Sequence, residues 1–387
     1  MKAEQFSFSL LKQGAPTRPT QAQCDNRGML VEKNTSLQNL NTFGIAASAD
    51  VLVRLTSTQA VQEVASSAIL RTPQGALRPS LVLGGGSNIV LSGDVVHAVV
   101  LKMEIPGMAL VEETAKHWIV QAGAGVRWHD LVEWTLQQGW GGLENLALIP
   151  GTVGAAPVQN IGAYGVELQD RFHSLDAVDL RTGQVFTLDA AQCAFAYRDS
   201  VFKHVPAQAG DFGLAGQAVI TQVRLALPKQ WQPELGYLEL QRKAESLGIA
   251  QPSAQQVCDW VCAIRRAKLP DPAQIGNAGS FFKNPTVTQE QCRDTIAREP
   301  KIVYYPLPDG RIKLAAGWLI DACGWKGKTL GRAGVYEHQA LVLVNRGTLG
   351  SCDNSVTGGE VMTLAAAIQT SVYERFGIRL EPEPIVV

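Results

Sequence analysis

One stretch of the chain, residues 141–168, combines the residue types that could hold a phosphate-bearing ligand. It carries six glycines, two prolines and only two charged residues, and its apolar positions follow neither a helical nor a strand period. Glycine lets the backbone approach a bulky ligand closely because no side chain stands in between. Backbone N–H groups that converge in this way bind anions such as phosphate. The stretch therefore predicts a cradle for a nucleotide or dinucleotide.

Two other glycine-rich elements precede this stretch. Residues 84–88 (GGGSN) directly follow an apolar run at 81–83, and they could equally form a tight turn between two strands. Gly123 and Gly125 come before an expected helix, but Trp128 stands where a dinucleotide fingerprint has its third glycine. The three elements together indicate nucleotide binding more strongly than any one of them.

The composition argues against several other functions. The 387 residues include 34 basic and 35 acidic ones, a formal net charge of -1, so no basic footprint for nucleic acid is present. No apolar run approaches the roughly 20 residues that span a bilayer. The N-terminus lacks the pattern of a signal peptide. We expect a cytoplasmic protein that binds neither nucleic acid nor membrane, and a monomer.

The seven cysteines are odd in number and scattered. Cys258 and Cys262 lie four residues apart on an expected helix, without a second Cys or His pair at zinc-site spacing. Free thiols in a reducing compartment explain this pattern better than a metal site, and we expect no metal.

The elements that must position the cradle mix without a regular strand–helix–strand rhythm, which predicts the α+β class with separate domains. Short apolar runs predict strands, and helical spacing with caps predicts helices. The expected strands lie at 51–55, 81–83, 89–91, 98–101, 118–121 and 218–227, with two hairpin-like strand runs near 174–188. The expected helices lie at 60–70, 128–137, 253–266 and 359–376, the last one ended by Gly377.

Composition shifts suggest where the domains divide. Residues 1–40 are rich in polar side chains and predict a flexible extension, with the ordered body starting at Asn41. Residues 41–227 hold all three glycine-rich elements, and the segment Lys229–Pro233 marks a boundary to a second domain at 228–370. Residues 371–387 form an expected C-terminal tail.

Seven motifs in sequence order carry a family resemblance. They are Asn41–Gly44 (NTFG), Leu83–Asn88 (LGGGSN), Gly142–Gly154 (GLENLALIPGTVG), Gln159–Gly165 (QNIGAYG), Tyr197–Ser200 (YRDS), Gly276–Pro285 (GNAGSFFKNP) and Leu314–Asp321 (LAAGWLID). Together they resemble the UDP-N-acetylenolpyruvoylglucosamine reductases, also called UDP-N-acetylmuramate dehydrogenases, over residues 41–385. The chain differs from the family pattern at its two ends and in a long loop at 206–217.

The resemblance implies a fold, two cofactors and a reaction. It implies an FAD-binding domain of the vanillyl-alcohol-oxidase type (the PCMH type) that holds FAD without a covalent bond, and a separate α+β substrate-binding domain. It implies that NADPH reduces the flavin, and that the flavin then reduces the enolpyruvyl group of a UDP-sugar to a lactyl ether for peptidoglycan synthesis. The protein must then stabilise charge on the substrate carboxylate and deliver a proton.

Three residues match the family's catalytic positions. Ser280 matches the proton donor, although an isolated Ser in a glycine-rich turn more often has no chemical role. Arg198 matches the arginine that stabilises the substrate carboxylate, a geometry that a guanidinium suits; without the motif, an ordinary salt bridge would be an alternative. Glu383 matches the catalytic glutamate better than Glu381, and the tail must fold back to bring it to the site.

The other implied site residues form two sets. The residues expected to contact FAD are Gly84, Gly85, Gly86, Ser87, Asn88, Gly123, Gly125, Pro150, Gly151, Thr152, Gly154, Ile161, Gly162, Tyr164 and Arg265. The residues expected to contact the substrate are Tyr164, Tyr197, Tyr237, Lys268, Asn284 and Gln339. Tyr237 matches a tyrosine on a loop that covers the substrate in one family subtype.

Two other functions remain open from the residues alone. Another FAD-dependent oxidase or reductase of the same fold would share the cradle, although no His or Cys stands beside residues 84–88 to tether the flavin covalently. A nucleotide-binding module without catalysis would not need Ser280, Arg198 and Glu383 spread over more than one domain.

Overall fold

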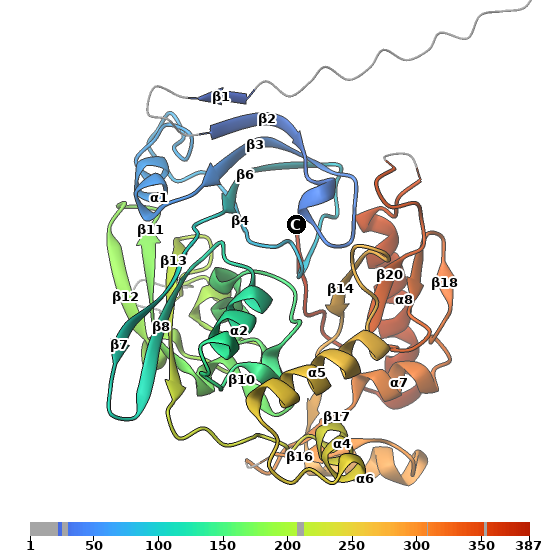
Figure 1. The fold of residues 1–387 in the computed structure, drawn as a ribbon. Coiled ribbons are helices and arrows are strands. Elements are labelled where there is room, and N and C mark those ends of the chain that lie inside the picture. The colour runs from blue at the N-terminus through green and yellow to red at the C-terminus, as the bar shows by residue number, and fades with distance from the viewer. Residues whose placement is uncertain (1–21, 25–29, 207–212, 308, 352–353) are drawn as a thin grey trace, which may run out of the picture.

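The computed structural model describes residues 22–24, 30–206, 213–307, 309–351 and 354–387. Three α+β parts follow one another along the chain, and the C-terminus returns to the first part (Figure 1). The mixed architecture confirms the α+β class.

The first part is a sheet with the strand order β1-β2-β3-β6-β4. Its centre is parallel, because both β3 and β4 pair with β6 in the same direction. Helix α1 (Thr58–Ala65) begins at Ser57, whose side chain accepts a hydrogen bond from the backbone N–H of Ala60. The strands are β1 (Ala22–Cys24), β2 (Leu30–Ser36), β3 (Ser48–Leu55), β4 (Ser80–Leu83), β5 (Ile89–Val90) and β6 (Val95–Met103).

The ordered body begins before Asn41, contrary to the expectation from sequence. Strand β2 pairs antiparallel with β3, from Leu30 opposite Arg54 to Ser36 opposite Ser48. The polar residues of β2 suggested a flexible extension, but β2 is held by backbone hydrogen bonds to both β1 and β3, and one face of an antiparallel pair can present polar side chains to water. Residues 1–21 and 25–29 lie outside the described residues.

The second part is an antiparallel sheet with the order β12-β11-β13-β8-β7. Helix α2 (Trp128–Gln137) has the bounds expected from sequence, and Gly139 follows it with a φ of 78°. The glycine-dense stretch forms the short 3-10 helices η2 (Glu144–Leu146), η3 (Val153–Gln159) and η4 (Leu168–Asp170). The remaining elements are β7 (Met108–Glu113), β8 (His117–Gly123), β9 (Gly162–Ala163), β10 (Val166–Glu167), β11 (Phe172–Asp179), β12 (Val185–Asp189), α3 (Ala190–Cys193) and β13 (Ala218–Pro228).

The third part contains two small sheets, β14-β20-β19-β18 and β15-β17-β16. The expected capping box of helix α5 (Ala254–Lys268) is present, since Ser253 and Gln256 exchange hydrogen bonds. Helix α8 (Gly358–Phe376) ends at Gly377, as expected. The other elements are α4 (Leu238–Leu247), β14 (Asn277–Ser280), β15 (Thr286–Val287), α6 (Gln289–Arg298), β16 (Tyr304–Pro306), β17 (Ile312–Leu314), α7 (Ala316–Ala322), β18 (Thr329–Leu330), β19 (Ala333–Val335), β20 (Val342–Asn345) and β21 (Ile385–Val386).

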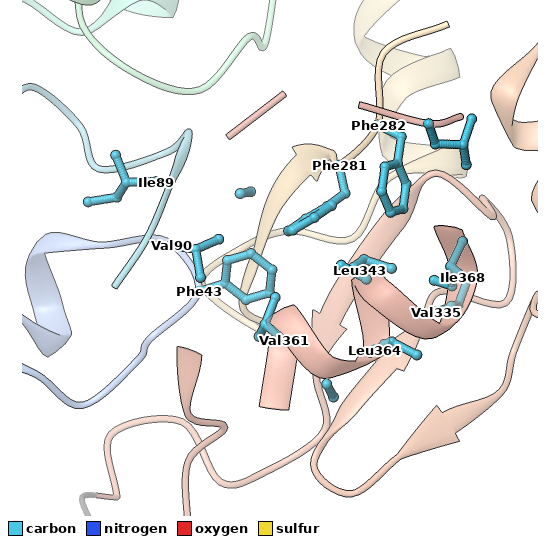
Figure 2. Packing of buried hydrophobic residues seen from close by; sticks show 14 of the residues in the cluster. Phe43, Ile89, Val90, Phe281, Phe282, Val335, Leu343, Val361, Leu364 and Ile368 are labelled. Carbon is cyan, nitrogen blue, oxygen red and sulfur yellow. The ribbon is translucent and has the colours of Figure 1, made fainter. Parts of the chain in front are cut away.

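One hydrophobic core joins the first and third parts. Phe43 and Val90 belong to the same buried cluster as Phe281 and Val361, although the two pairs are far apart in sequence (Figure 2). At the C-terminus, β21 pairs parallel with β5 of the first part. This pairing holds the end of the tail against the first part, starting two residues after Glu383.

The described residues contain neither a helix able to cross a membrane nor a cluster of metal-binding side chains. None of their helices is long and apolar enough to cross a membrane. Within the same ranges, no group of three or more His, Cys, Asp or Glu residues could hold a metal ion. Cys193, Cys258, Cys262, Cys292 and Cys323 have free thiols.

Candidate active site

The glycine-rich elements face one another across a cavity, which we call the cradle. The loop after β4 forms one wall, and the loop before η3 forms the other. Among the residues that line it are nine of the expected cofactor residues, namely Gly84, Gly85, Gly86, Ser87, Asn88, Pro150, Gly151, Thr152 and Ile161. Ser87 ties the two loops together, because its hydroxyl donates to the carbonyl of Pro150 at 3.0 Å.

The glycines of the cradle are required by backbone packing. A Cβ atom on Gly85 would lie 2.8 Å from the Cα of Gly151 in the opposite loop. A Cβ on Gly86, whose φ is +63°, would lie 2.0 Å from the carbonyl oxygen of Leu40. Such contacts leave no room for any side chain, so only glycine allows the loops to come this close.

Two buried hydroxyls without a hydrogen-bond partner in the described part of the chain show whether the site suits a nucleotide cofactor. Next to the cradle, a mostly apolar cavity shares Gly84 and Thr152 with it and is also lined by Ser80, Gly154 and Lys203. The Oγ1 of Thr152 and the Oγ of Ser80 are buried without a hydrogen-bond partner among the described residues. Buried polar atoms are normally paired, so these two atoms suit a ligand with ribose, phosphate or base groups. The residues present fit FAD.

A second cavity, which we call the catalytic cavity, adjoins the cradle and shares Ser87, Asn88 and Ile161 with it. The structure brings all three expected catalytic residues into its lining. Arg198 comes from the turn before η5 (Val201–Lys203), Ser280 from the end of β14, and Glu383 from the tail. Gly162 and Arg265, both expected to contact the cofactor, line the same cavity.

Arg198 and Glu383 form an ion pair inside this cavity. The Nε of Arg198 lies 3.1 Å from the Oε1 of Glu383, and the two side chains are only 19% and 12% exposed. A second guanidinium nitrogen of Arg198 donates to the carbonyl of Gly162 at 2.8 Å. The φ of Arg198 is +57°, a left-handed conformation that is uncommon for arginine and is typical of functional sites.

The tail is held at Glu383 from both sides. Its backbone N–H donates to the carbonyl of Phe281 at 2.8 Å, and its carbonyl accepts from the side chain of Asn88 at 3.3 Å. Glu381, the competing glutamate, instead lies 3.5 Å from Lys283 with a side chain that is 75% exposed. The geometry thus separates the two glutamates and turns only Glu383 toward Arg198.

Burial and the surrounding positive charges act on the pKa of Glu383 in opposite directions, and the net effect raises it. The positive charges that act against burial are those of Arg198, Lys203 and Lys283. Sequence reasoning missed the two lysines. Lys203, whose own pKa burial lowers, donates to the carbonyl of Arg198 at 3.1 Å. Its place five residues after Arg198, just beyond the Tyr197–Ser200 motif, was the available signal.

Two expected substrate residues, Tyr164 and Tyr237, meet although they are far apart in sequence. Their rings pack edge to face, with centroids 5.1 Å apart. Burial raises the pKa of Tyr164 to about 12, and its hydroxyl is hydrogen-bonded to Arg265. The Nε of Arg265 is buried and has no partner among the described residues, so it could bind a ligand atom.

Most of the other expected substrate residues are engaged within the protein. Lys268 pairs with Glu239, which follows Tyr237 in α4. The side-chain oxygen of Asn284 accepts from the backbone N–H of Ala316 at 2.9 Å, and that of Gln339 accepts from Leu341 at 3.3 Å.

The positively charged groups of Arg198 and Lys313 lie over the aromatic ring of Tyr197. The Arg198 guanidinium is 5.2 Å from the centre of its ring, and the Nζ of Lys313 is 4.0 Å from it. Burial raises the pKa of its hydroxyl, which is hydrogen-bonded to the backbone of Asn284. Tyr197 thereby links Arg198 to the residues expected to bind the substrate.

Gly123 and Gly125 have a clear packing role. A Cβ on either residue would come within 2.4 Å of backbone atoms in residues 104–106. Their glycine identity is explained by this close approach, and a contact with FAD stays a prediction for both.

Family models match the two halves of the chain. An FAD binding domain matches residues 49–189, and the C-terminal domain of UDP-N-acetylenolpyruvoylglucosamine reductase matches residues 271–387. These matches confirm the expected FAD cofactor and the expected combination of an FAD-binding domain with a second, C-terminal domain.

Individual proteins agree with the family models. The UDP-N-acetylenolpyruvoylglucosamine reductase of Bordetella pertussis is 53% identical over 92% of this chain and 95% of its own length. That of Azoarcus sp. is 52% identical over 93% of this chain and 98% of its own. The solved reductase from Thermus caldophilus, at 23% identity, covers 92% of this chain and 99% of its own with a TM-score of 0.60, which shows a shared fold. This chain therefore belongs to the UDP-N-acetylenolpyruvoylglucosamine reductase family, whose members are FAD-dependent oxidoreductases.

Proposed function

We propose that this chain reduces the enolpyruvyl group of UDP-N-acetylenolpyruvoylglucosamine to the lactyl ether of UDP-N-acetylmuramate, with NADPH as electron donor. The observation that carries the proposal is the meeting of Arg198, Ser280 and Glu383 in one cavity beside the cradle. The names of the similar reductases support the choice of substrate. We also propose that the enzyme acts as a monomer in the cytoplasm, in the synthesis of peptidoglycan precursors.

The reaction adds a hydride to the CH₂ carbon of the enolpyruvyl group and a proton to the carbon that bears the carboxylate. The cradle residues would hold FAD, which would supply this hydride after its reduction by NADPH. As the double bond becomes a single bond, negative charge builds up on the substrate carboxylate before the proton arrives. The protein residues must stabilise that charge and deliver the proton.

Arg198 is the residue we assign to charge stabilisation. Its guanidinium is mostly buried and already faces a carboxylate, that of Glu383. A buried cation stabilises developing negative charge more strongly than an exposed one because water does not screen it. Burial raises the pKa of Glu383 and so makes its protonated form more accessible than in an exposed glutamate; in that form the carboxyl would hydrogen-bond the substrate instead of repelling it.

Ser280 is the residue we assign to proton delivery. It lines the same cavity as Arg198 and Glu383, and it is exposed to solvent at the end of β14. A free hydroxyl is a weak acid, so the transfer depends on the basic carbon that forms when the hydride has been added. Solvent can then return the proton to the serine.

The variant Ser280→Ala tests this assignment. Reduction of the flavin by NADPH should stay within about threefold of wild type, while reoxidation by the sugar nucleotide should slow about 10²-fold or more, the scale of general-acid catalysis. Anaerobic stopped-flow absorbance measures both half-reactions separately. The variant Ser66→Ala, at the end of α1, is the control and should change neither. Equal slowing of both half-reactions would show that Ser280 is not the proton donor.

A further inference from the structure

Asn145 joins the two segments that carry the tyrosine pair Tyr164 and Tyr237. It lies in η2 and is only 1% exposed. Its side-chain nitrogen donates to the carbonyl of Tyr164 at 2.8 Å and to the carbonyl of Glu234 at 3.0 Å. One buried amide therefore bonds both the glycine-dense stretch and the connection from β13 to α4. Its contact in that connection, Glu234, lies three residues before Tyr237.

The neighbouring residue supports the same connection. Both carboxylate oxygens of Glu144 are used, one by the indole N–H of Trp231 at 2.7 Å and the other by the backbone N–H of Gly142 at 2.6 Å. A Cβ on Gly141 would lie 2.7 Å from the Trp231 ring, so the indole fits closely against the stretch. The connection is thus attached twice to the stretch, at Trp231 and at Glu234.

The backbone of Tyr164 needs such support. Its φ is +49°, a left-handed conformation that is unfavourable outside glycine. The hydrogen bond from Asn145 to its carbonyl stabilises this conformation, and the ring then packs on Tyr237. The side-chain oxygen of Asn145 has no partner among the described residues, so the amide is placed for its two donors.

We propose that Asn145 is a positioning residue, which sets the position of Tyr237 relative to Tyr164 and so holds the sugar nucleotide in place. The inference rests on the proposed function for the identity of the ligand, because Tyr237 is expected to cover the substrate. Asn145 itself does not take part in the chemistry. Its loss should weaken binding of the nucleotide and leave the chemical steps nearly unchanged.

The variant Asn145→Leu keeps the size of the side chain and removes both donors. In the FAD-loaded enzyme we expect the affinity for UDP, measured by calorimetry, to fall about tenfold, and KM for the sugar nucleotide to rise by a similar factor. We expect kcat to stay within about threefold. Amide hydrogen exchange at 230–237 should become faster, because the carbonyl of Glu234 loses its partner.

Two other variants make the test decisive. Thr221→Val is the control, since it also removes one buried donor to a backbone carbonyl, that of Asp176, but in the second sheet. It should change neither UDP affinity nor exchange at 230–237. If Asn145→Leu does not fold, Asn145→Ala replaces it with the same expected result.

Unchanged UDP affinity, or a fall in kcat with KM unchanged, would overturn the inference. Failure of the wild-type enzyme to reduce the enolpyruvyl sugar would count against the proposed function alone, since UDP affinity and exchange are measured without turnover.

Discussion

The cradle and the catalytic cavity share a wall but are built in opposite ways. In the cradle, backbone packs directly on backbone, so Gly85, Gly86 and Gly151 cannot carry side chains. The catalytic cavity is made by charged side chains that come from distant segments and meet only when the tail returns. Changes in the cradle should therefore disturb folding and FAD binding together. Changes in the catalytic cavity should leave FAD bound, affect stability less and mainly slow the chemistry.

The largest effect is expected for Gly86→Ala in the cradle. The new Cβ would lie 2.0 Å from the carbonyl oxygen of Leu40, and it would also strain a φ of +63°. We expect a loss of about 3 kcal/mol or more in unfolding free energy, together with loss of FAD. Denaturant unfolding and the flavin absorbance of the purified protein measure the two losses.

Gly75→Ala separates the clash from the strain in that experiment. Gly75 has a φ of +84°, but a Cβ on this residue would meet no heavy atom within 4 Å, so only the strain remains. It should cost about 1–2 kcal/mol and leave FAD bound. If Gly86→Ala were no worse than Gly75→Ala, close backbone packing would not be what defines the cradle.

Arg198→Met should have the next largest effect, and it should be confined to chemistry. We expect kcat/KM for the sugar nucleotide to fall about 10³-fold, the scale of removing one preorganised charge, with FAD still bound. The control is Arg224→Met, because Arg224 is also part-buried and paired, 2.5 Å from Asp176. It should lower stability while kcat/KM stays within about threefold. Loss of FAD from Arg198→Met would erase the contrast between the two regions.

Much of the fold could be predicted from the sequence, because the deciding signals are local. The bounds of α2, the capping box of α5 and the glycine that ends α8 follow from residues that lie next to each other. The strand β2 was missed, because its pairing with β3 depends on backbone hydrogen bonds that polar side chains do not reveal.

The candidate site shows the same contrast between features set by local residues and features set by long-range contacts. The glycine motifs predicted a nucleotide cradle by themselves. The pairing of Arg198 with Glu383 depends on β21 reaching β5, a long-range contact that has no local pattern, and it was expected only through the family resemblance. Lys203, Lys283 and Asn145 were missed because single polar residues look the same in sequence whether they are structural or functional.

The smallest effect is expected for the pH dependence of stability at Glu383. Because burial raises the pKa of this carboxyl in the folded protein, its contribution to stability is complete below the ordinary Glu pKa and is lost as the pH rises through the raised value. Glu383→Gln cannot ionise and escapes that loss. Its Tm relative to wild type should be higher at pH 8 than at pH 4.5, by about 1–3 °C. A difference in Tm that does not change with pH would mean that Glu383 titrates like an exposed carboxylate.

Anaerobic stopped-flow absorbance of the wild-type enzyme at the flavin band tests the central claim most directly. NADPH should bleach the band, and UDP-N-acetylenolpyruvoylglucosamine added next should restore it rapidly without oxygen. Bleaching without recovery would leave a flavoprotein with a different electron acceptor and contradict the proposed substrate. Recovery only when oxygen is admitted would show that the chain is an oxidase of the same fold.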